Sequence, residues 1–223
     1  MNLLETELGE LKSELLDMTH LVKEQMEKSI TAFYTFDHDL AKEVLKNEKR
    51  VNGIELKIDS RCEHILALFN PVAIDLRFVV ASLKMVSDLE RIGDNAEGLC
   101  KFLLMAEKPF DAALIEKMRF KEMNDIVLDM LNVLCESFET DNTKLARTVF
   151  SMDEVLDDIN SSANVALAEY IQCNTDKDKV MQAIYLLSMI RKTERVGDYI
   201  TNISEEIIFY VKAKVLKHKK NKE

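Results

Sequence analysis

Glycine and proline are scarce in this chain: its 223 residues include five Gly and two Pro. The tight turns of a many-stranded sheet depend on these residue types, because glycine tolerates positive φ and proline fixes φ at turn corners. A chain with so few glycines and prolines cannot form many β-hairpins. The sequence therefore predicts an all-α protein built from long helices with few connections.

Five breaks divide the sequence, two at Pro71 and Pro109 and three at polar clusters. Between the breaks, apolar residues recur every three or four positions, which is the period of a helix that buries one face. Five breaks predict six helices, each about 45 Å long. The expected helices cover residues 3–36, 38–70, 72–107, 110–140, 142–173 and 177–217.

The two halves of the chain repeat each other. A shift of about 105 positions places Val22 on Val127 and several other apolar residues on identical ones, in the same helical phase. Three helices with short connections pack as an antiparallel bundle. We therefore expect two tandem, structurally similar three-helix bundles, at residues 1–108 and 109–217, followed by a basic C-terminal tail at 218–223.

Composition excludes several classes of protein. No apolar run exceeds five residues, whereas a spanning helix needs roughly 18 to 20. The first ten residues carry three Glu and no basic leader region, so we expect a cytoplasmic protein. The formal net charge is −10 although the end of the chain is rich in lysine. Such a surface lacks the basic stripe that nucleic acid requires.

The repeated element with chemical content is Glu-Arg-(Ile or Val)-Gly-Asp, which occurs once in each half. It places Glu90 and Asp94, and in the second half Glu194 and Asp198, on one face of a helix. Like charges at this spacing repel each other, so a cation should lie against them. Carboxylate oxygens favour hard ions, here iron, manganese, magnesium or calcium.

Two glycines support a site beside these carboxylates. Glycine in a helix interior costs about 1 kcal/mol relative to alanine, yet Gly93 and Gly197 adjoin the acidic pairs in both halves. Close approach of another helix, or a bound ion, would explain both. Glu97 and Glu205 extend the two acidic faces and are weaker candidate ligands.

Other interpretations of the motif remain open. The carboxylates could simply pair with Arg91 and Arg195 in a plain helical scaffold. A ferritin-like carboxylate metal protein is a further alternative, but a di-iron oxidase needs Glu-x-x-His pairs on two helices. None of the four histidines lies near either motif, so we expect no enzyme activity.

The third expected helix and its repeat also carry a recognisable pattern. Residues 70–77 read Asn-Pro-Val-Ala-Ile-Asp-Leu-Arg, and residues 83–94 read Leu-Lys-Met-Val-Ser-Asp-Leu-Glu-Arg-Ile-Gly-Asp. Together with residues 191–198, Asn202 and Glu205, this pattern closely resembles the PhoU family of bacterial phosphate-regulation proteins. The resemblance covers essentially the whole chain.

The resemblance implies a cytoplasmic, often homodimeric, non-enzymatic protein. Family members are negative regulators of phosphate uptake and of the phosphate-starvation response. They connect the ATPase of the high-affinity phosphate ABC transporter to a sensor histidine kinase, so contact with the membrane is expected only through partners. The family's metal-binding motifs correspond here to Glu90, Asp94, Glu194 and Asp198. No phosphate-binding residue is expected, because the sequence shows no basic concave cluster.

The chain departs from the family pattern in its first half. The second helix of each repeat usually offers an Asp to the motif, and Asp157 meets this expectation as a weaker candidate ligand, whereas Asn52 takes its place in the first half. Lys101 likewise stands where the second half has Glu205. We therefore expect weaker metal binding in the first half, and equal metal losses in Glu90→Ala and Glu194→Ala would contradict this. A nearer alternative function is that of a PhoU-like accessory protein of a low-affinity phosphate permease.

Overall fold

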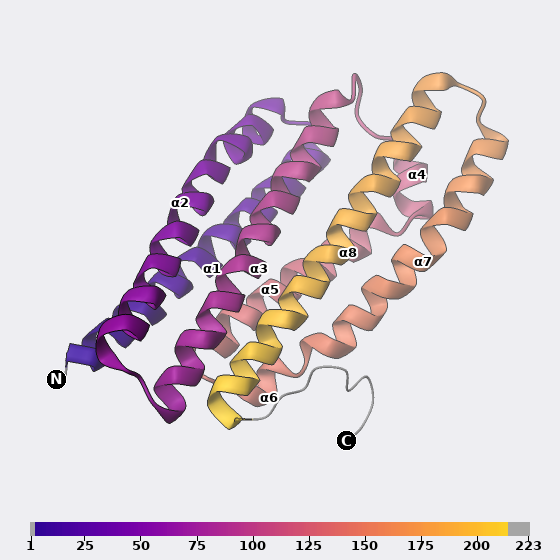
Figure 1. The fold of residues 1–223 in the computed structure, drawn as a ribbon. Coiled ribbons are helices and arrows are strands. Elements are labelled where there is room, and N and C mark those ends of the chain that lie inside the picture. Colours follow the sequence, from indigo (N-terminus) through magenta and orange to yellow (C-terminus); the bar gives the residue numbers. More distant parts are fainter. Residues whose placement is uncertain (1–2, 214–223) are drawn as a thin grey trace.

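The computed structural model describes residues 3–213, and the predicted all-α architecture is confirmed (Figure 1). Its helices run up and down beside one another, with α2, α3, α8 and α7 in a row and α1 and α5 behind them. The helices of the first half are α1 (Leu3–Thr35), α2 (His38–Phe69) and α3 (Ala73–Met105). Those of the second half are α4 (Ala112–Lys117), α5 (Phe120–Glu139), α6 (Thr143–Ala146), α7 (Val149–Cys173) and α8 (Lys177–Lys212).

The first bundle follows the predicted helices closely. Asp37 caps α2 by accepting hydrogen bonds from the backbone N–H groups of Asp39 and Leu40, which satisfies donors that the first turn leaves free. The α2 helix ends at Asn70, which adopts a left-handed conformation (φ 44°) directly before Pro71. Asn70 and Pro71 are both residue types that terminate helices. After them, α3 runs antiparallel to α2.

The prediction of six helices is wrong in the second half, where two of the expected helices are broken. The helix expected at 110–140 is divided into α4 and α5 because Arg119 takes φ 53°, a left-handed value that no helix interior allows. Its guanidinium nevertheless forms ion pairs with Glu122 and Asp158. The helix expected at 142–173 is likewise divided into α6 and α7 by a turn at Arg147 and Thr148.

The last helix also ends earlier than expected. We predicted a helix to residue 217, but α8 ends at Lys212, and Ala213 closes it in a left-handed conformation (φ 55°). The predicted basic tail at 218–223 lies outside the described residues. Within the described helices, none is both long and apolar enough to cross a membrane.

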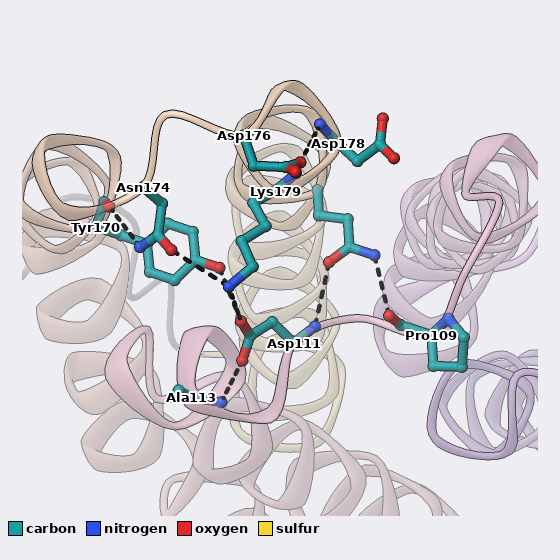
Figure 2. Close-up of polar contacts among 9 residues, drawn as sticks. Pro109, Asp111, Ala113, Tyr170, Asn174, Asp176, Asp178 and Lys179 are labelled. Carbon is teal, nitrogen blue, oxygen red and sulfur yellow. Dashed lines mark hydrogen bonds and ion pairs between the residues drawn. The ribbon is translucent and has the colours of Figure 1, made fainter.

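Polar contacts order the connection between the halves (Figure 2). The Asp111 carboxylate caps α4 by accepting from the N–H of Ala113 at 2.9 Å, and it also accepts a hydrogen bond of 3.0 Å from the Tyr170 hydroxyl. The Lys179 ammonium, at the start of α8, lies 3.6 Å from the same carboxylate. The loop after the first bundle is thereby tied to α7 and α8.

The two halves share one hydrophobic core, in which α3 and α8 lie side by side and antiparallel. Lys84 reaches Glu206 at 3.0 Å near one end of this contact, and Gly98 adjoins Lys192 near the other. The two Glu-Arg-(Ile or Val)-Gly-Asp motifs therefore lie near each other on these adjacent helices. The division at residues 108 and 109 stays a prediction.

Candidate metal centre

Three carboxylates from two helices converge in the first bundle. Glu90 and Asp94 of α3 meet Glu48 of α2, and one oxygen from each side chain lies within 4.8 Å of the others. Glu48 is buried, Glu90 is half-buried and Asp94 is exposed, so the group reaches from the protein interior to the surface. Among residues 3–213, this is the one such group of three.

Gly93 makes this convergence possible. A Cβ atom at position 93 would lie 3.0 Å from the Glu48 Oε2 atom and 3.2 Å from the Val51 Cγ1 atom. These separations are shorter than ordinary van der Waals contact. The glycine therefore lets α2 approach α3 and brings the carboxylate of Glu48 against the motif, which agrees with the close helix approach expected from the sequence.

The electrostatics of the group favour a cation. Burial, followed by the negative charges of Asp94 and Glu90, raises the pKa of Glu48 to about 7. Burial and the charge of Asp94 also raise the pKa of Glu90. The Oε1 atom of Glu48 is buried and lacks a hydrogen-bond partner, although buried carboxylates normally have one. A bound ion would satisfy that oxygen and offset the repulsion.

A pH titration of the metal-free protein tests this description. The folded protein holds the Glu48 proton up to about pH 7, whereas the unfolded chain releases it near 4.5. Between these values Glu48 binds more protons in the folded state, so the contribution of Glu48 to the free energy of unfolding should fall as pH rises from 4.5 to 7. Urea unfolding at several pH values, in the presence of a chelator, measures the free energy of unfolding. The Glu48→Gln variant should lose most of this slope, and an unchanged slope would contradict the prediction.

The second bundle repeats the arrangement with different contacts. A Cβ at Gly197 would lie 2.7 Å from the Asp153 Oδ1 atom of α7. Burial and the charges of Asp198 and Asp157 raise the pKa of Glu194. The predicted residues Glu194, Asp198 and Asp157 are therefore electrostatic neighbours.

The weaker candidates of the acidic faces are placed differently. Glu97 forms an ion pair with Lys101, and its charge also acts on Glu48. Glu205 lines a hollow between α3 and α8 together with Glu206, away from the convergent group. Neither belongs to the group of three carboxylates.

Sequence reasoning missed two residues of these sites, Glu48 and Asp153. They are related by the same shift of 105 positions, and both are acidic, so the repeat contained the signal. The position predicted from the sequence, Asn52 and Asp157, lies one helical turn further on. The expectation of a weaker first site therefore counted too few carboxylates, and the ranking of the two sites stays a prediction.

The donor set suits a hard metal ion. Oxygen ligands from carboxylates are those that Mg²⁺, Ca²⁺, Mn²⁺ and iron prefer, and no described thiol or imidazole joins the group. Glu48, Glu90 and Asp94 would hold the ion, which would supply a positive charge at the surface of α3. A divalent ion would leave the three carboxylates with one negative charge.

Comparison with known proteins decides the family. The PhoU domain matches residues 15–103 and again residues 120–207. The chain belongs to the PhoU family. Both copies of the Glu-Arg-(Ile or Val)-Gly-Asp motif lie inside the matched PhoU domains, so the resemblance and the internal duplication inferred from the sequence are confirmed.

PhoU relatives match nearly the whole chain. The phosphate-specific transport system accessory protein PhoU homolog of Aquifex aeolicus is 33% identical over 97% of this chain and 96% of its own. PhoU of Escherichia coli is 30% identical over 95% of this chain and 86% of its own.

Solved PhoU structures share the fold. PhoU from Pseudomonas aeruginosa superimposes with a TM-score of 0.85 at 28% identity, covering 94% of this chain and 99% of that one. The phosphate transport system regulatory protein PhoU from Streptococcus pneumoniae gives 0.82 at 28% identity, covering 95% and 98%.

Proposed function

We propose that this PhoU protein is a non-enzymatic, metal-binding regulator of phosphate uptake that acts in the cytoplasm. The observation that carries the proposal is similarity along nearly the full chain to proteins named phosphate-specific transport system accessory protein. The convergence of Glu48, Glu90 and Asp94 supports the metal-binding part. The second proposed site comprises Glu194 and Asp198, with Asp153 and Asp157 contributed by α7.

The proposed action is negative regulation by docking. When phosphate is plentiful, the protein would restrain the ATPase of the high-affinity phosphate transporter and keep the sensor histidine kinase from signalling starvation. Helices as long as α2 and α7 offer extended lateral surfaces, which suit docking without catalytic machinery. A homodimer would present such surfaces twice.

Deletion of the gene tests the regulatory proposal. In high phosphate, the deletion strain should take up phosphate faster and express a starvation reporter that the parent strain represses. The intact gene should restore repression. A reporter that stays fully repressed in the deletion strain would refute the proposal.

Purification of the tagged protein with its partners distinguishes the proposed function from the main alternative, an accessory role at a low-affinity permease. Under the proposal, the transporter ATPase co-purifies with it. An accessory protein of a low-affinity permease would instead bring that permease, and the uptake defect of a deletion strain would persist when the ATPase gene is absent.

A further inference from the structure

The groove between α3 and α8 has two halves related by the internal repeat. The helices are antiparallel, with Gly98 beside Lys192 at one level and Lys84 beside Glu206 at another. A shift of 104 positions relates α3 to α8, so each hollow along the groove has an equivalent. Any difference between the two hollows therefore reflects their side chains.

The upper hollow, toward the end of α3, has a volume of about 670 Å³. Its walls include Lys192 and Arg195 of α8 and Phe102 and Met105 of α3. The lower hollow is smaller, about 390 Å³, and its walls include Asp88, Glu205 and Glu206.

Equivalent positions in the two hollows carry different charges. Lys192 of the upper hollow corresponds to Asp88 of the lower one, and Lys101 corresponds to Glu205. Phe102 similarly corresponds to Glu206. The walls of the upper hollow carry four cations and three carboxylates, and those of the lower hollow carry two cations and three carboxylates. The formal net charge is therefore positive at one end of the groove and negative at the other.

Arg91 and Lys101 of the upper hollow pair with Asp88 and Glu97, whereas Lys192 and Arg195 are available to a ligand. Among residues 3–213, no carboxylate lies within ion-pair distance of Lys192 or Arg195. Arg195 donates a hydrogen bond of 2.8 Å to the hydroxyl of Tyr199, whose ring lies 5.8 Å from the arginine Cζ atom. Tyr199 is buried, so its ring supports the guanidinium and fixes its place.

Gly98 leaves room for the second cation. A Cβ at position 98 would lie 2.6 Å from both Cε and Nζ of Lys192, so the end of the lysine side chain occupies space that this glycine leaves open on α3. The equivalent residue in the lower hollow is Asn202. The upper hollow thus combines the lysine beside Gly98 with an arginine held by Tyr199 on one wall.

We infer that the upper hollow binds a phosphate group, held by Lys192 and Arg195. Two adjacent cationic donors form charge-assisted hydrogen bonds with phosphate oxygens. Phe102 and Met105 extend the hollow beyond the cations, which leaves room for the organic part of a nucleotide. The chemistry is common to inorganic phosphate and to a nucleoside monophosphate, and the test separates the two.

The inference rests on the proposed metal site. Glu90, Asp94 and Glu97 also line the upper hollow, and their charges oppose an anion. Lys101 pairs with Glu97, whereas Glu90 and Asp94 face Glu48. A metal ion held by those three carboxylates would offset their charge, so phosphate binding should depend on the ion.

Equilibrium dialysis of the full chain with Mn²⁺ and radiolabelled inorganic phosphate tests the inference. The Mn²⁺-loaded protein should retain phosphate saturably, and chelation should weaken retention. Lys192→Met should weaken it about tenfold, the expected effect of losing one charged hydrogen bond. Arg195→Gln, at an exposed position, should act similarly. Lys84→Met, which removes the same charge at the lower hollow, should leave binding within twofold.

Bound Mn²⁺ is measured in the same dialysis cell as bound phosphate. A failure of the phosphate inference can therefore be distinguished from a failure of the proposed metal site. Mn²⁺ retained without phosphate would overturn the inference and leave the metal site intact, while loss of both would overturn the metal site. Equal phosphate retention in Lys192→Met would also overturn the inference. AMP that competes more tightly than phosphate identifies a nucleotide, and weaker competition identifies inorganic phosphate.

Discussion

Replacing Glu48 with glutamine is expected to weaken Mn²⁺ binding in the first PhoU domain by at least about 100-fold, because a neutral amide replaces a charged carboxylate ligand and outer-shell changes alone cost 10- to 100-fold. Glutamine keeps the size of the side chain but removes the charge that the ion would neutralise. Glu90 and Asp94 remain, but two carboxylates hold a hard ion less tightly than three. Equilibrium dialysis with elemental analysis measures the loss.

The matched control for this variant is Glu43→Gln on the same helix. Glu43 is exposed and pairs with Lys28, which retains a second partner in Glu24. Mn²⁺ binding should be unchanged in the control. A Glu48→Gln protein that binds Mn²⁺ as the unmodified protein does would exclude Glu48 as a ligand.

Gly197→Val is expected to destabilise the protein by about 2 to 3 kcal/mol, the usual cost of overpacking a tight core. A Cβ at this position would lie 2.5 Å from the Leu156 Cδ1 atom and 2.7 Å from the Asp153 Oδ1 atom. Both belong to side chains of α7, so these side chains or the helix that carries them must shift. Urea unfolding measures the change.

The same substitution at Gly53 provides the control. Gly53 lies in α2, and no heavy atom would lie within 4 Å of a Cβ there. The Gly53→Val protein should stay within about 0.5 kcal/mol of the unmodified protein, as surface substitutions usually do. Equal destabilisation at both positions would contradict the explanation that the approach of α7 requires glycine at position 197.

The fold was predictable from the sequence because helix periodicity and the repeat are local and redundant signals. The scarcity of glycine and proline predicted long helices, and the shift of 105 positions predicted two copies. The break at Arg119 was missed because arginine is a good helix former. Its left-handed backbone accompanies contacts across the bundle, which no local pattern encodes.

Only the part of the candidate site that lies on α3 was predictable from the sequence. Glu90 and Asp94 share a motif that repeats, so their common face could be read directly. Glu48 lies in a separate helix, and its partnership with them depends on how closely α2 packs against Gly93. The cationic hollow was missed for the same reason, because Lys192 and Gly98 meet only where α3 crosses α8.

A crystal structure of the Mn²⁺-loaded protein tests the central claim most directly. We expect an anomalous difference peak between the carboxylates of Glu48, Glu90 and Asp94, with each nearest oxygen about 2.0 to 2.6 Å from the ion, as is usual for hard cations. Loaded crystals without a peak at this position would contradict the proposed metal site.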